Sequence, residues 1–436
     1  MQLPSYVNRC LMALEDAGFA CYAVGGCVRD AVLGLTPHDY DLCTAATPEQ
    51  IKAVFAGQGM VLAGEKHGTV GIITEKGVVE ITTFRTEGGY RDNRHPDWVE
   101  FVDYVEGDLA RRDFTVNAMA YSPVRGFADP FDGREDLKNK VLRAVGDPAQ
   151  RFREDSLRIL RGVRFAVRFG LAPDAQTEKA MKDLAPLMEN LARERVFDEL
   201  CKLLPLVTAE DLCRFAPVLT AVIPELAPMV SFDQHSPHHA YDVYTHTAHV
   251  VEATPPDLAL RWAALMHDAG KIPTFKQDET GRGHFHGHAQ QSAKMADEIL
   301  HRLKAPTALR ERVIFLIDKH MVLFSAEKKT LRRQLSRWGL EPMQQLLKLQ
   351  KADFGSKGVF GEEQPFDQVE QIIQQIIAEN SCLKITDLAV NGHDLMALGI
   401  RGKAIGETLE KLLNLVLDEK IPNEKPALLA ASQKKN

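Results

Sequence analysis

Residues 23–44 read AVGGCVRDAVLGLTPHDYDLCT, and this stretch decides how the rest of the chain is interpreted. An apolar run ends at the double glycine Gly25-Gly26, and a short amphipathic segment over 27–33 follows. This order predicts a strand, a tight turn and a short helix, and glycines at such a turn let backbone N–H groups approach a phosphate. Arg29 would add a guanidinium contact to that phosphate. An ordinary strand-to-helix turn without a ligand explains the same pattern.

Two aspartates follow this turn. Asp39 and Asp41 flank Tyr40 in a strand-like run, where side chains at i and i+2 point to the same face. Two adjacent like charges are costly unless a cation lies between them, and Mg²⁺ binds few carboxylates while keeping phosphate oxygens as further ligands. Glu80 interrupts the apolar run VVEITTF and is the predicted third acid. Asp39, Asp41 and Glu80 are therefore the predicted catalytic residues, with Mg²⁺ held mainly by the two aspartates.

The chain as a whole has the composition of a globular protein. Its 436 residues, 45% hydrophobic and 26% charged, suffice for about three domains of ordinary size. We find no run of 18 uncharged apolar residues, which predicts a cytoplasmic protein without a membrane span. The seven cysteines contain no CxxC pair, so they are expected to be reduced packing residues rather than a disulfide framework or a zinc site.

The charge is distributed unevenly along the chain. A net charge of −7 argues against a uniformly basic surface for nucleic acid. However, residues 141–170 contain seven arginines, and residues 327–338 contain five lysines and arginines. Each cluster is interpreted either as a surface that grips a polyanion or as an ordinary solvated helix face.

The pattern of apolar residues changes near residue 147. Before it, short runs rich in β-formers alternate with helical patterns and with glycine or proline. After it, apolar residues recur at three- and four-residue spacing. The predicted fold class is therefore α+β, with a mixed β-sheet and helices at the N-terminal end followed by a mostly α-helical remainder.

The motifs resemble those of a known family. GGCVRD followed by DYD is similar to the first motif of the class II nucleotidyltransferases, the family of tRNA CCA-adding enzymes and bacterial poly(A) polymerases. Further similar motifs follow in order and extend the resemblance over essentially the whole chain: FRTEGGYRDNRHP (84–96), DLARRDFTVNAMAY (108–121), DPFDGREDLKNKVLR (129–143) and REDSLRILRGVRFAVRFG (153–170). The resemblance implies an enzyme that adds CCA to tRNA 3′ ends from CTP and ATP without a nucleic-acid template, by two-metal transfer releasing pyrophosphate.

The resemblance also implies a division into domains. It predicts a catalytic nucleotidyltransferase head over 1–145 and a neck with the nucleotide-template region over 146–235. An HD body over 236–357 and a helical tRNA-binding tail over 358–436 would follow. The oligomeric state, monomer or homodimer, stays open.

Base selection is predicted in the segment EDSLRILRGVRF. Asp155, Arg158, Arg161 and Arg164 recur every third residue, which would form one stripe on a helix. The resemblance assigns Asp155 and Arg158 to the incoming base and the later arginines to the triphosphate. A carboxylate accepts from the exocyclic amine of cytosine or adenine and a guanidinium donates to the neighbouring ring nitrogen, whereas G and U present the opposite pattern. The stripe is also expected to pack its apolar residues inward.

The remaining nucleotide contacts come from the head. By resemblance, Gly25, Gly26, Arg29 and Arg112 bind the nucleotide, and Asp113 and Asn117 hold their loop in shape. The polar, glycine-rich segment 88–98 is predicted to be a loop that accompanies the change from CTP to ATP.

A second site is predicted in the helical half. Histidines and aspartates in YTHTAHV, LMHDAGK, HFHGHAQ, DKHM and KADFG resemble the ligand order of the HD phosphohydrolase domain. Imidazole and carboxylate together suit Ni²⁺ or Mn²⁺ better than Mg²⁺. The predicted ligands are His246, His267, Asp268 and Asp353, with His288 and His320 supporting a second metal. A degenerate HD fold that serves only as an RNA-binding scaffold is the alternative.

Other readings of the whole chain also stay open. The segment LGIRGKAIG would place Arg401 and Lys403 before a helix starting near Ile405, where they could hold a tRNA phosphate or simply form a helix-turn-helix. An enzyme that adds only the terminal A, or a poly(A) polymerase, shares the head motifs. An HD phosphohydrolase or an RNA-binding protein with an inactive head are the alternatives of another class.

Overall fold

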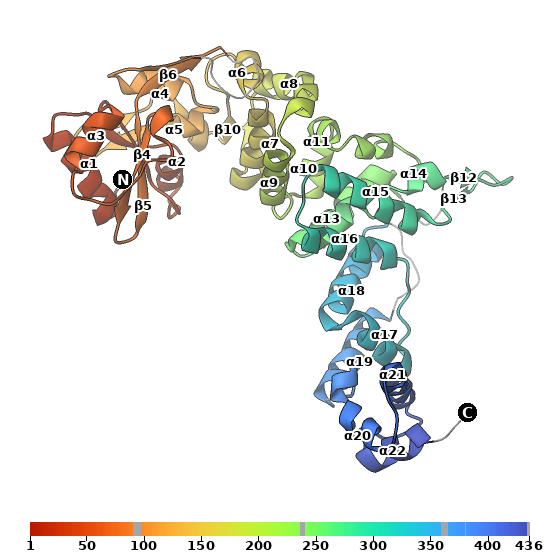
Figure 1. Ribbon diagram of the computed structural model, residues 1–436. Coiled ribbons are helices and arrows are strands. Elements are labelled where there is room, and N and C mark those ends of the chain that lie inside the picture. Colours follow the sequence, from red (N-terminus) through yellow and green to blue (C-terminus); the bar gives the residue numbers. More distant parts are fainter. Residues whose placement is uncertain (90–97, 236–239, 359–364, 380, 434–436) are drawn as a thin grey trace. The chain divides into compact units, whose positions relative to one another are not determined.

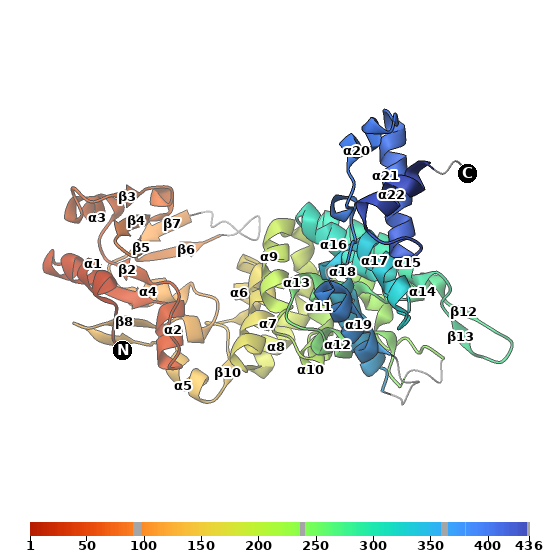
Figure 2. The ribbon, with the colours of Figure 1, turned by 90° about the horizontal axis from the view of Figure 1, so that it is seen from below.

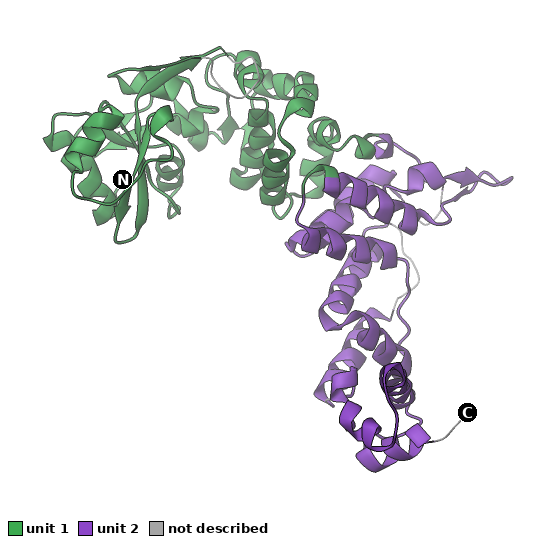
Figure 3. Cartoon of the chain, viewed as in Figure 1, with its two compact units in different colours: residues 1–227, 302–304 green, residues 228–301, 305–436 purple. Residues whose placement is uncertain are grey.

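The computed structural model describes most of the chain, namely residues 1–89, 98–235, 240–358, 365–379 and 381–433. Contacts divide the chain into two compact units, residues 1–227 with 302–304 and residues 228–301 with 305–436 (Figure 3). No helix in these described ranges combines the length and the apolar composition needed to cross a bilayer.

A seven-stranded mixed sheet forms the N-terminal end of the first unit (Figure 1). Its strands lie in the order β3-β4-β5-β2-β1-β8-β9. They are β1 (Cys21–Val24), β2 (Asp41–Thr44), β3 (Met60–Val61), β4 (Thr69–Thr74), β5 (Gly77–Thr83), β8 (Ala120–Ser122) and β9 (Gly126–Ala128). Only the pair β2–β5 is parallel among the paired strands of this sheet, because the chain crosses over between them through helix α3 (Pro48–Val54).

Helices of the head pack against this sheet. They are α1 (Ser5–Asp16), α2 (Gly26–Val32), α3 and α4 (Val105–Ala110) (Figure 2). Helix α5 (Gly133–Lys138) instead contacts the short turn Thr115–Asn117 and the strand β10 (Val141–Leu142). Part of the core is formed by Val24, Cys43, Phe84 and Leu109. All seven cysteines lie in the described residues and none forms a disulfide; five of them are buried.

A separate hairpin leaves the sheet after Phe84. Strands β6 (Arg85–Gly88) and β7 (Trp98–Phe101) pair antiparallel. The loop predicted over 88–98 lies outside the described residues except at its ends.

The neck consists of helices, as the three- and four-residue spacing predicted. It contains α6 (Pro148–Glu154), α7 (Leu157–Phe169), α8 (Ala175–Asp183), α9 (Arg193–Leu203), α10 (Ala209–Arg214) and α11 (Ala216–Val222). Helix α7 packs against α9 and buries Leu157, Ile159, Leu160 and Val163. Strand β10 (Val141–Leu142) pairs with β11 (Ala172–Pro173) and connects the head to the neck. A mixed sheet followed by helices confirms the α+β fold class.

The second unit is almost entirely helical. Its longer helices are α12 (Val243–Ala253), α13 (Leu258–Met266), α15 (His288–Arg302), α16 (Thr307–Lys319), α17 (Lys328–Trp338), α18 (Leu340–Gly355), α19 (Phe366–Ala378) and α21 (Lys403–Leu417). Shorter elements are α14 (Lys271–Thr274), α20 (Gly392–Ala397), α22 (Lys425–Gln433) and a hairpin of β12 (Lys276–Gln277) and β13 (Gly283–His284).

The basic cluster on α17 is largely neutralised within the protein. Lys328 pairs with Glu379, Arg332 with Glu419 and Arg333 with Asp418. These ion pairs connect α17 to α19 and to the end of α21. The cluster therefore stabilises the contact with the tail. Neither interpretation of the sequence, as a polyanion-binding surface or as a solvated helix face, predicted this role.

The turn LGIRGKAIG precedes helix α21, which begins at Lys403, two residues before the predicted start. Gly399 and Gly402 have positive φ angles of 86° and 58°, a region that glycine adopts without strain. Arg401 and Lys403 are exposed at this turn.

Candidate functional site

The double glycine forms the predicted turn between β1 and α2, but for a different reason. Gly25 has φ 75° and ψ −125°, and a Cβ on it would lie 2.8 Å from Nη1 of Arg112. Its N–H donates to the carbonyl of Met119 at 3.1 Å rather than facing open space. The turn therefore needs glycine because of its positive φ, and a Cβ would in addition push the end of the Arg112 side chain aside, a contact that the phosphate-turn interpretation did not include.

The predicted acids meet through the parallel pairing of β2 and β5. Asp41 is the first residue of β2 and lies in register with Glu80. Asp39 precedes the strand, so its expected place within the strand is wrong, and its side chain is 85% exposed. Desolvation first, and then the negative charges of Glu80 and Asp39, raise the pKa of Asp41, while Arg112 lowers it.

This electrostatic strain fits a divalent cation. Carboxylate oxygens that repel one another are the hard ligands Mg²⁺ prefers. The three acids do not converge as tightly as the groups in the second unit, because within the described residues only those groups bring three candidate ligand atoms within 4.8 Å.

One cavity of about 410 Å³ in the first unit collects the predicted nucleotide-binding residues. Its lining contains all eight of them: Gly25, Gly26, Arg29, Arg112, Asp155, Arg158, Arg161 and Arg164. It also contains Asp41, but not Asp39 or Glu80. Residues that the sequence interpretation did not assign to nucleotide binding complete it: Arg111, Asp113, Asn117, Phe165, Arg168 and Arg195.

A buried hydrogen-bond chain fixes the arginines at the head side of this cavity. Arg29 Nη1 donates to Asn117 Oδ1 at 2.5 Å, and Asn117 Nδ2 donates to Asp113 Oδ1 at 3.0 Å. Arg161 Nε donates to the other oxygen of Asp113 at 2.9 Å. These contacts agree with the prediction that Asp113 and Asn117 hold the loop in shape, and they extend it to two arginines.

Asp113 should also contribute to stability in a pH-dependent way. Burial raises its pKa, but Arg161 and Asn117 outweigh burial and lower the pKa from 3.8 to about 2. The ionised carboxylate therefore stabilises the fold above pH ~4, and this contribution is lost as the pH falls through about 2. Asp113→Asn is expected to lower the free energy of unfolding at pH 7 by about 2 kcal/mol.

Urea unfolding between pH 7 and pH 3 measures this difference. The gap between wild type and Asp113→Asn should shrink to about half at pH 3, since part of the linkage is then lost. Asp183→Asn changes an exposed carboxylate of the same unit and is the control. A gap of constant size across this pH range would contradict the assignment.

Aromatic rings lie beneath the cluster of arginines. The guanidinium carbons of Arg29, Arg161 and Arg164 lie 5.4, 5.4 and 4.4 Å from the Phe165 ring centroid, and Arg29 lies 4.3 Å from that of Phe169. Burial lowers the pKa of Arg29. In the sequence Phe165 and Phe169 carry no signal beyond helical packing. The rings make cation–π interactions with these arginines, whose positive charges otherwise repel one another.

Of the two predicted base-selecting residues, Asp155 lies between α6 and α7, whereas Arg158 lies within α7. Asp155 ends α6 with extended backbone, φ −143° and ψ 102°, and α7 begins only at Leu157. The expected helical stripe is therefore wrong for Asp155. Arg158, in the first turn of α7, donates to Glu154 Oε2 at 2.7 Å and to the carbonyls of Arg151 and Arg111. Three of its five N–H donors are used within the described residues, which leaves two for a ligand.

Three ion pairs missed by the sequence interpretation support this region. Asp155 Oδ2 accepts from Arg195 Nη2 at 2.9 Å. The buried Asp108 pairs with Arg111 and Arg112, and these cations lower its pKa against the effect of burial. Asp108 stands in a quoted motif and could have been found, whereas Arg195 is 40 residues from Asp155 and carries no local signal.

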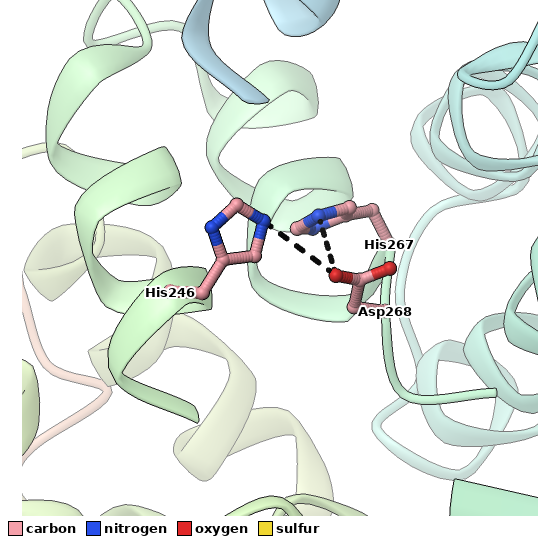
Figure 4. Close-up of side chains that lie close together, drawn as sticks. All are labelled: His246, His267 and Asp268. Atoms are coloured by element: carbon pink, nitrogen blue, oxygen red, sulfur yellow. Dashed lines mark ion pairs between the residues drawn. The ribbon is translucent and has the colours of Figure 1, made fainter. Parts of the chain in front are cut away.

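The second unit brings the predicted histidines and aspartates into one buried cluster, of which Figure 4 shows His246, His267 and Asp268. His246 Nε2 and His267 Nε2 lie 3.6 and 3.2 Å from Asp268 Oδ2. On the other side, His288 Nε2 lies 3.5 Å from Asp268 Oδ1 and 3.3 Å from His320 Nε2. Asp353 Oδ1 lies 3.0 Å from His246 Nε2. Asp268 is therefore shared by two three-residue groups, each with the spacing of metal ligands.

Each of the four histidines is oriented in the same way. The Nδ1 atoms lie 2.6–3.2 Å from main-chain carbonyls, those of Ser356, Ala264, Phe285 and Ile317. A proton on Nδ1 leaves Nε2 as the free ligand atom, which is the usual arrangement around a protein-bound metal. Nε2 of His267 is buried without a hydrogen-bond partner among the described residues. Burial lowers the pKa of His288 and, together with His267, that of His320 to about 4.

A cavity of about 390 Å³ opens onto this cluster. It is lined by Asp268, His288, His320 and Asp353, and by cationic or imidazole side chains of Lys271, Arg282, His284, His286 and Lys357. Lys271 Nζ is buried and lies 2.8 Å from both Asp268 Oδ2 and Gln234 Oε1. The lining suits an anion placed next to the ligand cluster.

Three sequence families match parts of the chain. Residues 21–143 match the family described as the poly A polymerase head domain. Residues 170–213 match the probable RNA- and SrmB-binding site of polymerase A, and residues 279–432 match the putative domain 2 of tRNA nucleotidyltransferases.

Individual relatives agree with these families. A CCA-adding enzyme of Leuconostoc mesenteroides is 50% identical over 194 residues, which cover 44% of this chain but only 48% of that protein's length. A CCA-adding enzyme of Levilactobacillus brevis is 33% identical over 429 residues, 97% of this chain and 95% of the relative. The structure of the Bacillus stearothermophilus CCA-adding enzyme in complex with CTP matches 99% of this chain and 97% of its own, at 27% identity and a TM-score of 0.71.

Similarity over nearly the full length of both chains, together with the ordered motifs and the shared fold, leads to one assignment. The chain belongs to the family of CCA-adding enzymes.

Proposed function

We propose that this chain adds CCA to tRNA 3′ ends, using CTP and ATP and no nucleic-acid template. The observation that carries the proposal is the single cavity that contains Asp41, the arginine cluster and the pair Asp155 and Arg158. Template-independent nucleotidyl transfer needs acids that bind metal, cations that bind a triphosphate and a pair of residues that reads the base. The residues of this site match all three requirements. The names of the relatives, CCA-adding enzymes throughout, support the same reaction.

The head would supply the chemistry of the transfer. Mg²⁺ held by Asp39, Asp41 and Glu80 would activate the primer 3′-hydroxyl and stabilise the α-phosphate as pyrophosphate leaves. Arg29, held by Asn117 and Asp30, would orient the triphosphate for in-line attack. The remaining arginines of the cluster would neutralise the charge on the leaving group.

The pair Asp155 and Arg158 would select the base. The Asp155 carboxylate accepts from the exocyclic amine of cytosine or adenine, and Arg158 donates through its remaining N–H groups to the adjacent ring nitrogen. U and G would leave a carbonyl against the carboxylate and an N–H against the guanidinium, a mismatch worth several kcal/mol in a buried site.

The aromatic rings under the arginines yield a prediction. Phe165→Leu is expected to raise KM for both CTP and ATP about 3- to 10-fold while kcat changes less than about twofold, because the guanidinium groups lose a cation–π partner. Steady-state assays on tRNA measure this split. Phe152→Leu is the control, since Phe152 is buried in the same unit and no cation lies over its ring in the described residues. A fall in kcat alone would contradict the prediction.

Addition to defined tRNA transcripts tests the proposed function. Three transcripts would end before the first terminal cytidine, after it and after the second cytidine, and the products made with CTP and ATP would be sequenced. CCA on the first transcript supports the proposal. Only A on the third transcript would assign a restricted A-adding enzyme, and long A tails would assign a poly(A) polymerase.

We propose a separate metal-dependent phosphohydrolase site in the second unit, in an HD body over about 236–357. The observation that favours it is the set of four histidines with Nδ1 next to main-chain carbonyls and Nε2 directed at shared carboxylates. Ni²⁺ or Mn²⁺ fits this ligand set, and the cationic lining fits a phosphate ester. Cleavage of a 2′,3′-cyclic nucleotide with either ion tests it. Bound metal without cleavage would favour a structural scaffold.

A further inference from the structure

The Asp155 carboxylate is held from two sides. Oδ1 accepts from the Leu157 N–H at 3.1 Å, and Oδ2 accepts from Arg195 Nη2 at 2.9 Å. The backbone of Asp155 joins α6 to α7: its N–H donates to the Arg151 carbonyl at 3.4 Å and its carbonyl accepts from the Arg158 N–H at 3.0 Å. These bonds hold the backbone, whereas the orientation of the side chain depends on the two contacts to its carboxylate. Among the described residues, Arg195 is the only one whose side chain hydrogen-bonds to this carboxylate.

Arg195 reaches the site from helix α9. This helix packs against α7, and its Glu199 also accepts from Arg164 at 2.5 Å. Arg195 lines the same cavity as Arg158, and its Nη1 is buried without a hydrogen-bond partner in the described part of the chain. One guanidinium nitrogen thus binds the base-reading carboxylate, while the other remains a buried donor at the edge of the nucleotide cavity.

Pairing with a guanidinium restricts what the carboxylate can do. Arginine presents its N–H donors in a planar fork, so the hydrogen bond from Nη2 fixes the direction in which Oδ2 of Asp155 accepts. Each oxygen still has a second lone-pair direction for the exocyclic amine of cytosine or adenine. Without Arg195 the carboxylate can rotate about its side-chain bonds and turn away from the base edge. Its hydrogen bond with the exocyclic amine of the base is then weakened.

We propose that Arg195 is a positioning residue for base selection, which orients the Asp155 carboxylate so that CTP and ATP are preferred over UTP and GTP. The inference rests on the proposed function, because it presupposes that Asp155 reads the base. It differs from a role in folding alone, since a structural defect would lower the use of all four nucleotides equally.

Arg195→Met keeps the length of the side chain and removes its donors. We expect kcat/KM for CTP and ATP to fall about tenfold or more, with a smaller change for UTP and GTP, so that the CTP-to-UTP and ATP-to-GTP selectivity ratios both fall about tenfold. Arg195→Lys keeps the charge but not the planar fork, and should lose about threefold in selectivity. Competition assays on the three tRNA transcripts measure these ratios.

Arg193→Ala is the matched control. It lies two residues away on α9, donates to the carbonyl of Glu189 and does not line the cavity. Equal losses for all four nucleotides in Arg195→Met would overturn the proposal. Wild-type selectivity in Arg195→Lys would also overturn it. This second test can still be carried out if the methionine variant fails to fold. Wild-type protein that adds neither CMP nor AMP would refute the proposed function, whereas normal wild-type addition with unchanged ratios in both variants refutes only the role of Arg195.

Discussion

Asp41→Asn is expected to lower the rate of nucleotide addition roughly 1,000-fold or more, because the loss of a metal-binding carboxylate removes several kcal/mol of transition-state stabilisation. The same change should make the folded protein more stable. Desolvation and the charge of Glu80 raise the pKa of Asp41, so its ionised form destabilises the fold at every pH above that pKa. Asparagine has the same shape and no charge.

Single-turnover assays and thermal unfolding without added metal measure the two effects separately. Mg²⁺ with CTP should raise the unfolding temperature of the wild type and leave that of Asp41→Asn almost unchanged. Asp183→Asn, at an exposed carboxylate of the same unit, should behave like the wild type in both assays. A variant that loses activity together with thermal stability would assign Asp41 a structural role instead.

Asp268→Asn is expected to abolish metal binding in the second unit. Asp268 belongs to both three-residue groups, one with His246 and His267 and the other with His288 and His320. Its replacement should therefore remove both metal equivalents, whereas His246→Ala and His320→Ala should each remove one. Nucleotide addition should stay within about twofold of the wild type, since no ligand of this cluster lines the nucleotide cavity.

Metal content after dialysis against Ni²⁺ or Mn²⁺ provides the measurement. His286→Ala is the control, because His286 lines the adjacent cavity but belongs to neither group. Full metal content in Asp268→Asn would refute the assignment of the site. Equal losses in all the histidine variants, His286 included, would indicate binding at surface histidines.

Where the motifs are local, the structure brings the predicted residues together. Gly25, Arg29 and the arginines at 158, 161 and 164 line one cavity with Asp41, whereas Glu80 is outside the lining and lies in register with Asp41. The place of Asp155 could not be predicted, because a three-residue spacing indicates one continuous helix. In the structure one helix ends at Glu154 and the next begins at Leu157.

Contacts between distant segments were beyond the reach of the sequence. Asp155 meets Arg195 and Arg29 stacks on Phe169 only after the neck helices have packed against the head. For the histidine cluster, the resemblance supplied the ligand types. For His267, His288 and His320 the carbonyl next to Nδ1 lies three residues earlier and depends on local backbone geometry, whereas that of His246 belongs to Ser356, 110 residues away. The ion pairs of α17 with the tail likewise could not be predicted from the positions of the charged residues in the sequence.

The close approach of Gly25 and Arg112 has a consequence for how this enzyme could evolve. A side chain at position 25 would strain the turn, where φ is 75°, and would also displace the Arg112 guanidinium. Arg112 in turn pairs with Asp108 and lowers the pKa of Asp41, so its displacement would reach the acids as well. Position 25 is therefore expected to stay glycine for as long as Arg112, 87 residues away, keeps its pairing with Asp108.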